Sequence, residues 1–336
     1  EYLPVKYYGA EDAENVIVVM GSGVETASET AAFLAACGEK TGVLQITLYR
    51  PFPAEDLIAT LPATAQNIAV LDRTKESGSS GEPLYQDVMI TLMEAVSSKK
   101  LSSMPLIIGG RYGLSSKEFT PAMAKAVFDE LESARPKRRF TVGINDDVTR
   151  LSLDYDPEFH TEPEDTLRAV FYGLGADGTV GANKNTIKII GEDTPLHAQG
   201  YFVYDSKKSG AMTVSHLRFA KEPIRSTYLI RRAKFVACHY APLLERQDVL
   251  ATAADGATFL LNTHHAPAEA FSRLPLEVQR TILEKKLKFY VIDAFAVAKE
   301  AGLDRYISTV MQVCFFKLSG VLPMEEALEH LRHGVE

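Results

Sequence analysis

The first part of the chain alternates short apolar runs with longer amphipathic stretches. Residues 16–20 are all apolar and lead into Gly21-Ser22-Gly23, after which a helix-like stretch continues to Gly38. Short apolar runs bounded by turn residues are typical of buried strands in parallel sheets. Repeated strand–helix units of this kind favour a doubly wound parallel sheet. Further strands are predicted at 43–48, 69–71 and 106–108, and helices at 51–61, 82–96 and 120–132.

This periodicity is lost between residues 133 and 164. The stretch contains Pro136, the basic residues 137–139 and two Asp-rich turns, with one short apolar run at 140–142. Prolines, charges and turn residues between periodic segments indicate loops and linkers. We therefore predict a first domain over residues 1–140, a linker over 141–164 and a second domain over 165–336.

The second half restarts the same pattern. Residues 167–174 predict a strand, followed by a loop and a helix over 175–191. Two β-rich runs at 201–204 and 212–217 are separated by a polar turn. The fold class predicted for the whole chain is α/β, with two doubly wound domains in succession. The remaining expected elements are strands at 235–238, 258–261 and 289–292, and three closing helices.

Length and composition agree with two globular domains. At about 150 residues per domain, 336 residues correspond to roughly two. Hydrophobic residues make up 46% and charged residues 24%, which are ordinary globular values. With 36 basic and 44 acidic residues the net charge is −8, so we expect no general attraction to nucleic acid or to an anionic membrane. No apolar run approaches the roughly 18 residues of a membrane-spanning helix.

Cysteine and histidine usage argues against several kinds of site. Cys37, Cys238 and Cys314 are scattered and odd in number, which predicts a reducing compartment and no iron–sulfur or structural zinc motif. The pair His264-His265 has no partners at metal-ligand spacing, and no Gly-x-Ser-x-Gly elbow indicates a hydrolase. Because the chain starts at Glu1 without a signal-like stretch, we expect a processed protein or a piece of a longer one.

The sharpest local signal is a glycine-rich loop at the end of the first strand of the second domain. Gly173, Gly175 and Gly178 have the spacing of the dinucleotide fingerprint, and Asp177 and Thr179 accompany them at the expected start of a helix. Backbone N–H groups at such a turn can converge on an anion. A tight turn that packs a helix against the sheet is the simpler explanation, and a free-standing NAD-binding protein is an alternative that rests on this spacing alone.

A second candidate is the polar turn between the strands at 201–204 and 212–217. It contains Lys207, Lys208 and Ser209, and Arg218 lies beyond it. Lysines beside hydroxyl groups can bind phosphate as point charges. A solvated hairpin turn is the alternative. Taken with the glycine loop, these residues predict a site for a phosphorylated ligand.

In the first domain, polar loops follow the predicted strands at 21–23 and 72–81. The carboxyl ends of parallel strands are where ligands dock in such sheets. The Ser- and Gly-rich part of the second loop, residues 77–81, nevertheless suggests a mobile segment. We expect it to contact a neighbouring domain rather than to take part in catalysis.

Several motifs resemble those of the pyruvate:ferredoxin (flavodoxin) oxidoreductases and of the fused pyruvate:NADP+ oxidoreductases. An example is Leu71-Asp72-Arg73-Thr74-Lys75-Glu76. The motifs follow one another in order over nearly the whole chain, so the resemblance is specific. The others occupy residues 18–23, 48–52, 109–117, 143–149, 172–185, 201–218 and 314–320.

The resemblance implies a role in oxidative decarboxylation of pyruvate to acetyl-coenzyme A and CO2 by a pyruvate synthase-type oxidoreductase. Residues 1–140 resemble its transketolase C-terminal-like domain, and residues from 165 onward resemble its γ-type domain, which is associated with coenzyme A. The phosphorylated ligand is then coenzyme A. Its expected contacts are Gly173, Gly175, Asp177, Gly178, Thr179, Lys207, Lys208, Ser209 and Arg218.

The resemblance also implies partners and cofactors that these 336 residues would not hold themselves. Thiamine diphosphate, Mg2+ and [4Fe-4S] clusters belong to other domains of the family, and electrons pass to ferredoxin, flavodoxin or NADP+. We therefore expect this chain alone to be inactive and the full-length protein to be a homodimer. The expected location is the cytoplasm, or a mitochondrial or hydrogenosomal matrix. The alternative is a scaffold for domain or dimer contacts, as in sulfite reductase subunits that resemble this family.

Overall fold

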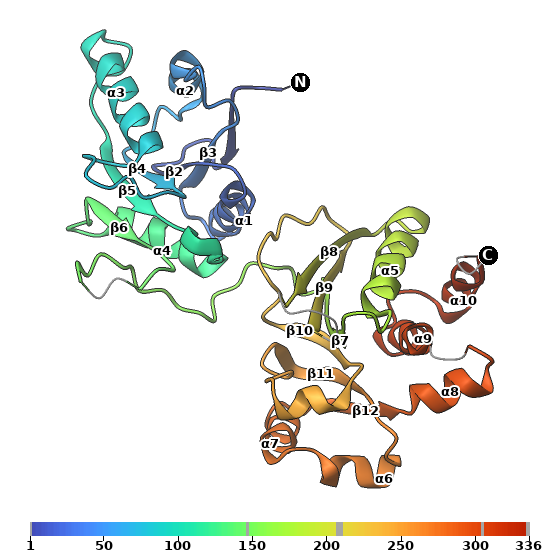
Figure 1. The fold of residues 1–336 in the computed structure, drawn as a ribbon. Helices are drawn as coiled ribbons and strands as arrows, with labels where there is room; N and C mark the ends of the chain where they lie inside the picture. The colour runs from blue at the N-terminus through green and yellow to red at the C-terminus, as the bar shows by residue number, and fades with distance from the viewer. Residues whose placement is uncertain (1, 146–147, 206–210, 304–305, 334–336) are drawn as a thin grey trace. The chain divides into compact units, whose positions relative to one another are not determined.

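The computed structural model describes residues 2–145, 148–205, 211–303 and 306–333 (Figure 1). The chain forms two compact units, which are described separately. The first comprises Glu1–Glu162 together with Arg225–Tyr228, and the second comprises Pro163–Ile224 and Leu229–Glu336. The division falls inside the stretch predicted as a linker. The segment Arg225–Tyr228 was not expected in the first unit.

The described residues of the first unit form a sheet with the strand order β1-β3-β2-β4-β5-β6. Strands β2 to β6 are parallel, whereas β1 pairs antiparallel with β3 at the edge. Because β3 and β4 lie on opposite sides of β2, the topological switch point falls at the carboxyl ends of β2 and β4. The bounds are β1 Val5–Gly9, β2 Asn15–Met20, β3 Thr41–Ile46, β4 Asn67–Asp72, β5 Leu106–Arg111 and β6 Arg139–Thr141.

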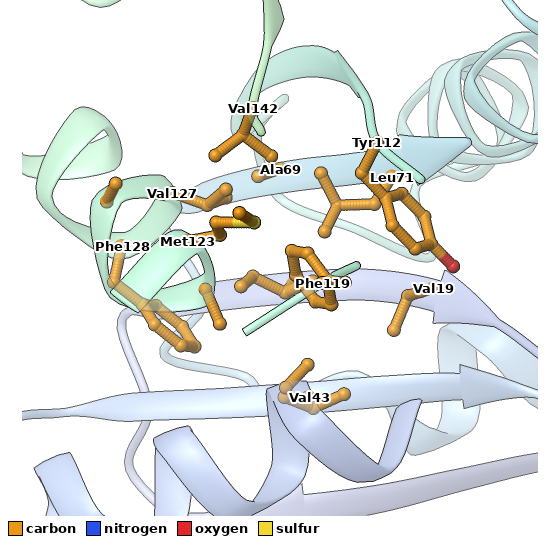
Figure 2. Packing of buried hydrophobic residues seen from close by; sticks show 14 of the residues in the cluster. Val19, Val43, Ala69, Leu71, Tyr112, Phe119, Met123, Val127, Phe128 and Val142 are labelled. Carbon is orange, nitrogen blue, oxygen red and sulfur yellow. The ribbon is translucent and has the colours of Figure 1, made fainter. Parts of the chain in front are cut away.

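Both faces of this sheet are covered by helices, which is why its strands are apolar at successive positions. On one face, Val19, Val43 and Leu71 pack against Met123 and Val127 (Figure 2). The intervening residues Val18 and Val70 belong to a second core with Leu84 and Val88 on the opposite face. The helices are α1 Gly23–Ala36, α2 Ala54–Thr60, α3 Pro83–Ser97 and α4 Pro121–Glu132.

The stretch after β6 and the distant segment Arg225–Tyr228 are both attached to α1. Phe159 packs edge-on against Phe33, with ring centroids 5.6 Å apart. The carboxylate of Glu29 accepts hydrogen bonds from Ser226 Oγ at 2.8 Å and Tyr228 Oη at 2.6 Å, and also from the hydroxyl of Thr161. One side chain of α1 therefore ties two distant parts of the chain to the first unit.

The described residues of the second unit form a sheet with the order β12-β11-β10-β7-β9-β8. Strands β7, β10, β11 and β12 are parallel, β9 is antiparallel to β7, and β8 is antiparallel to β9. The predicted α/β class is confirmed for both units, and each sheet is mixed rather than wholly parallel. The bounds are β7 Leu167–Leu174, β8 His197–Tyr204, β9 Met212–Ala220, β10 Ala233–Cys238, β11 Ala253–Asn262 and β12 Lys288–Ile292.

The two faces of the second sheet also carry separate cores. Phe171, Phe219 and Phe315 lie in one, and Phe259 and Val278 lie in the other. No described helix is both long and apolar enough to cross a membrane. The helices are α5 Thr179–Asp193, α6 Pro267–Ala270, α7 Leu276–Glu284, α8 Ala294–Glu300, α9 Ile307–Ser319 and α10 Met324–His333, of which α6 and α7 were not predicted.

Candidate functional site

The glycine loop joins β7, which lies between β10 and β9, to the N-terminus of α5 (Figure 1). A Cβ atom on Gly173 would lie 2.5 Å from Thr179 Oγ1 and 2.8 Å from Asp177 Oδ2. Gly178 has a φ of 85°, and a Cβ there would lie 2.6 Å from Ser308 Oγ. Close packing and left-handed backbone geometry therefore require glycine at these two positions.

The carboxylate of Asp177 sits inside this loop. Its Oδ1 accepts from the Thr179 amide at 2.8 Å, and its Oδ2 accepts from the Leu174 amide at 2.7 Å. The amides of Gly175 and Asp177 donate to Ala211 O at 2.8 Å and Leu174 O at 3.2 Å. Three amides that we expected to face phosphate therefore have acceptors within the chain. A carboxylate near a helix N-terminus is favoured by the helix dipole and takes the place of an external anion.

The turn between β8 and β9 ends beside the glycine loop. Met212 pairs with Leu174 in the β7–β9 register, and Ala211 accepts the hydrogen bond from Gly175. On the other side of the turn, the Asp205 amide donates to Met212 O at 3.2 Å. The predicted ligands Lys207, Lys208 and Ser209 lie outside the described residues. The end of their turn, at Ala211, nevertheless adjoins the loop, as the β7–β9 register requires.

Arg218 is not part of this arrangement. It pairs with Arg168, six positions before Leu174 on β7, so at about 3.3 Å per residue it lies roughly 20 Å from the loop along the strand. Its side chain is 1% exposed, and Nη1 donates to Gln199 Oε1 at 3.0 Å. The structure therefore corrects the prediction that groups Arg218 with the glycine loop. The two are close in sequence, but β9 carries Arg218 toward the other end of the sheet.

His239, to which the sequence analysis assigned no role, contacts the base of the loop. Its amide donates to Tyr172 O at 2.8 Å, and its Nδ1 lies 2.7 Å from Thr179 Oγ1. Burial lowers the pKa of His239 to about 4, against the opposing effect of Asp177, so the imidazole is neutral at neutral pH. Its Nε2 has no hydrogen-bond partner among the described residues.

A cavity of about 380 Å³ opens beside His239, at the carboxyl ends of β10 and β11. The sequence signal that could have located this cavity is the presence of polar residues directly after β10 and β11, such as His239 and Thr263. Among the described residues, no group of three or more His, Cys, Asp or Glu side chains could hold a metal ion. The polar and aromatic residues that line the cavity are His239, Tyr240, Glu245, Asn262, Thr263, His264, His265, Arg273 and Phe295.

The first unit has a smaller cavity, of about 240 Å³, beside the loop after β4. Asp72 ends β4, and its carboxylate accepts from the amides of Leu84 and Tyr85 at 3.0 and 3.1 Å. Arg111 Nε, in the cavity wall, lies 3.0 Å from Glu82 Oε1. Because Asp72, Glu82 and Arg111 pair with partners inside the unit, we place the candidate site in the second unit.

Comparisons with known proteins match both halves of the chain. The family described as pyruvate ferredoxin/flavodoxin oxidoreductase matches residues 168–336, and the one described as pyruvate:ferredoxin oxidoreductase core domain II matches residues 13–114. A solved structure of pyruvate oxidoreductase subunit PORC from Thermotoga maritima has a TM-score of 0.38 and 15% identity. That match covers 48% of this chain and 81% of the subunit.

Three curated relatives are similar over almost the whole chain. Pyruvate-flavodoxin oxidoreductase of Nostoc is 58% identical, and the match covers 100% of this chain and 28% of that protein. Pyruvate:ferredoxin oxidoreductase of Moorella thermoacetica is 53% identical, with 98% and 28% covered. The mitochondrial pyruvate dehydrogenase [NADP(+)] of Euglena gracilis is 43% identical, with 99% and 18% covered. The chain therefore spans under a third of these relatives and belongs to the pyruvate ferredoxin/flavodoxin oxidoreductase family.

Proposed function

We propose that this chain is a part of a thiamine-dependent enzyme that converts pyruvate oxidatively to acetyl-coenzyme A and CO2 and passes the electrons to ferredoxin, flavodoxin or NADP+. The names of the relatives support the reaction class. Since the chain matches 28% of the Nostoc relative, we assign the remaining steps to segments outside it. Within the enzyme, this part organises domains and positions coenzyme A.

The observation that carries the coenzyme A assignment is the contact of Ala211, where the turn after β8 ends, with the glycine loop. The hydrogen bond from Gly175 to Ala211 O places the end of that turn at the carboxyl edge of the sheet. Lys207 and Lys208 supply the positive charge that a pyrophosphate requires. Because the amides of Gly175, Asp177 and Thr179 already have acceptors within the chain, we assign the main phosphate contacts to the lysines and Ser209. Gly173, Gly175, Asp177, Gly178 and Thr179 then form the wall of the site.

The chemical contribution of these residues is positioning. Holding coenzyme A at a fixed site turns an encounter between two molecules into a local step, which lowers the entropic part of the barrier. Movement of such a site relative to a reaction centre can also set the timing of thiol delivery. This proposal requires no catalytic side chain in the 336 residues.

We assign thiamine diphosphate, Mg2+ and the [4Fe-4S] clusters to other parts of the longer protein. Cys238 lies 3.3 Å from Tyr240 O, and burial raises the pKa of its thiol to about 12. Burial also raises the pKa of Cys314. The chain has three cysteines, whereas a [4Fe-4S] cluster is held by four cysteine thiolates.

Titration calorimetry of the 336-residue chain with coenzyme A tests the positioning role. We expect Lys207→Ala and Lys208→Ala each to weaken binding about tenfold, since a charge-assisted hydrogen bond contributes roughly 1.5–3 kcal/mol. Lys188→Ala, which alters an exposed lysine of α5 beside Glu192, is the matched control and should bind like the parent. Equal affinity of all four proteins would remove the lysines from the site.

A viologen-reduction assay tests whether the redox reaction takes place outside these 336 residues. The chain supplied with pyruvate, thiamine diphosphate, Mg2+ and coenzyme A should not reduce the dye. Turnover by the 336 residues alone would contradict the assignment of the redox chemistry elsewhere. For the full-length protein we propose a homodimer in the cytoplasm or an organelle matrix, which sedimentation and fractionation would check.

A further inference from the structure

The cavity at the carboxyl ends of β10 and β11 has features that a phosphate site does not explain. The ends of parallel strands near a change in strand order are where nucleotides bind in α/β sheets. β7 connects through β8 and β9 on one side before the chain returns to β10 on its other side, so the strand order changes between β7 and β10, next to this cavity. The cavity volume, about 380 Å³, lies within the usual range for small-molecule sites.

His239 lines this cavity, and its buried Nε2 has no hydrogen-bond partner among the described residues. The side chain is 3% exposed, and Nδ1 is engaged by Thr179 Oγ1 at 2.7 Å. Nε2 is the remaining ring nitrogen and has no partner within the described residues. An unpaired buried polar atom is costly, and Nε2 has less than 1 Å² of exposed surface. A ligand in the cavity therefore gains this hydrogen bond when the lining beside His239 shifts to admit it.

The walls of the cavity combine aromatic and aliphatic side chains and are largely uncharged. Tyr240 and Phe295 line it, together with the adjacent imidazoles of His264 and His265, whose ring centroids are 4.1 Å apart. The single arginine in the lining, Arg273, pairs with Glu269 at 3.2 Å. Flat rings that offer both apolar faces and polar edges favour a planar partner with the same character.

We infer that this cavity is a binding site for a nucleobase. A purine or pyrimidine ring is planar and uncharged, and its edge carries both donors and acceptors that can pair with a neutral imidazole. The cavity is unfavourable for a simple anion, because Glu245 lies in the wall and the described lining contains no unpaired cation. The base of a free nucleotide and the adenine of coenzyme A share this chemistry, and only the second source rests on the proposed function.

Calorimetry with adenosine tests the site itself, with D-ribose as the probe that lacks the base. Adenosine should bind the 336-residue chain at one site, and ribose should not. His239→Phe should weaken adenosine binding about tenfold through loss of the hydrogen bond to Nε2. Tyr240→Ala removes a 42% exposed ring from the wall, so it should leave the fold intact and weaken binding about fivefold.

Tyr290→Ala is the matched control, because Tyr290 on β12 is equally exposed but does not line the cavity. Absence of adenosine binding to the parent at millimolar concentration would overturn the inference. So would adenosine binding that Tyr240→Ala and Tyr290→Ala leave equally strong.

Coenzyme A and 4′-phosphopantetheine distinguish the two sources of the base. If Tyr240→Ala weakens coenzyme A as much as adenosine and leaves 4′-phosphopantetheine unaffected, the cavity holds the adenine of coenzyme A. If adenosine binding is weakened and coenzyme A binding is unchanged, the base belongs to a separate nucleotide. Adenosine binding without any coenzyme A binding would support the cavity and refute the proposed positioning role.

Discussion

Glu29 allows a quantitative test of how the first unit holds its distant segments. Its carboxylate accepts from Ser226 Oγ at 2.8 Å, from Tyr228 Oη at 2.6 Å and from the Thr161 hydroxyl. All three donors are in side chains that are more than nine-tenths buried. Glu29→Ala removes the shared acceptor and leaves these hydroxyls with fewer partners away from water.

The loss of stability expected for Glu29→Ala follows from the number of hydrogen bonds that the substitution removes. A hydrogen bond to a charged group contributes about 1.5–3 kcal/mol, and bonds that share one acceptor are less than additive. We therefore expect Glu29→Ala to lower the free energy of unfolding by about 3 kcal/mol. Glu29→Gln retains an acceptor oxygen and should cost about half as much.

The free energy of unfolding of the first unit is measured by urea denaturation. Hydrogen exchange of the amides at 225–228 is measured alongside it. Glu25→Ala is the control, because Glu25 lies on the same helix and its contact with Arg225 is exposed and long, at 3.9 Å. That variant should change stability by less than about 0.5 kcal/mol. If Glu29→Ala and Glu25→Ala were equally stable, or if exchange at 225–228 did not accelerate, the reasoning would be refuted.

Two further predictions concern the second unit. Gly173→Ala should destabilise it by about 1–3 kcal/mol, because the new Cβ would meet Thr179 Oγ1 at 2.5 Å. Gly181→Ala, where nothing lies within 4 Å, should be neutral or stabilising in the same thermal melt, and the opposite order would contradict the packing argument. His216 and His239 should make the unit acid-sensitive, since burial lowers the pKa of each to about 4, with the charge of Arg218 adding to the effect at His216. The unfolded state then binds more protons below about pH 6.5, so stability should fall by about 2 kcal/mol per histidine between pH 7 and 5. His216→Gln should reduce the pH dependence measured by urea denaturation, and an unchanged slope would exclude His216 as a source.

Local sequence patterns predicted most of the secondary structure. The apolar runs at 16–20 and 167–174 became β2 and β7, because a strand covered on both faces must be apolar at successive positions. The edge strand β1 was missed, since Val5–Gly9 contains no comparable run and is stabilised by pairing with β3. The helix α7 was missed as well, and its packing against the sheet through Val278 and Ile282 is a long-range property.

The candidate site was only partly predictable, because several of its contacts join distant residues. The glycine spacing located the β7–α5 loop, yet the occupation of its amides by Asp177 depends on a side-chain rotamer within the folded turn. Arg218 was grouped with the glycine loop because it follows the polar turn in the sequence, whereas β9 places it opposite Arg168, six positions from Leu174 along β7.

The sequence by itself determined the α/β class, the position of the glycine loop and the membership of the family, because apolar periodicity, glycine requirements and motif order are local properties of the chain. The tertiary structure alone decided which distant residues meet. It brought His239 to Thr179 across 60 positions, opened the cavity beside it, and placed Arg225–Tyr228 in the first unit. Strand order and register determine which distant residues come into contact. Both depend on hydrogen bonds and packing between segments that no local sequence pattern contains.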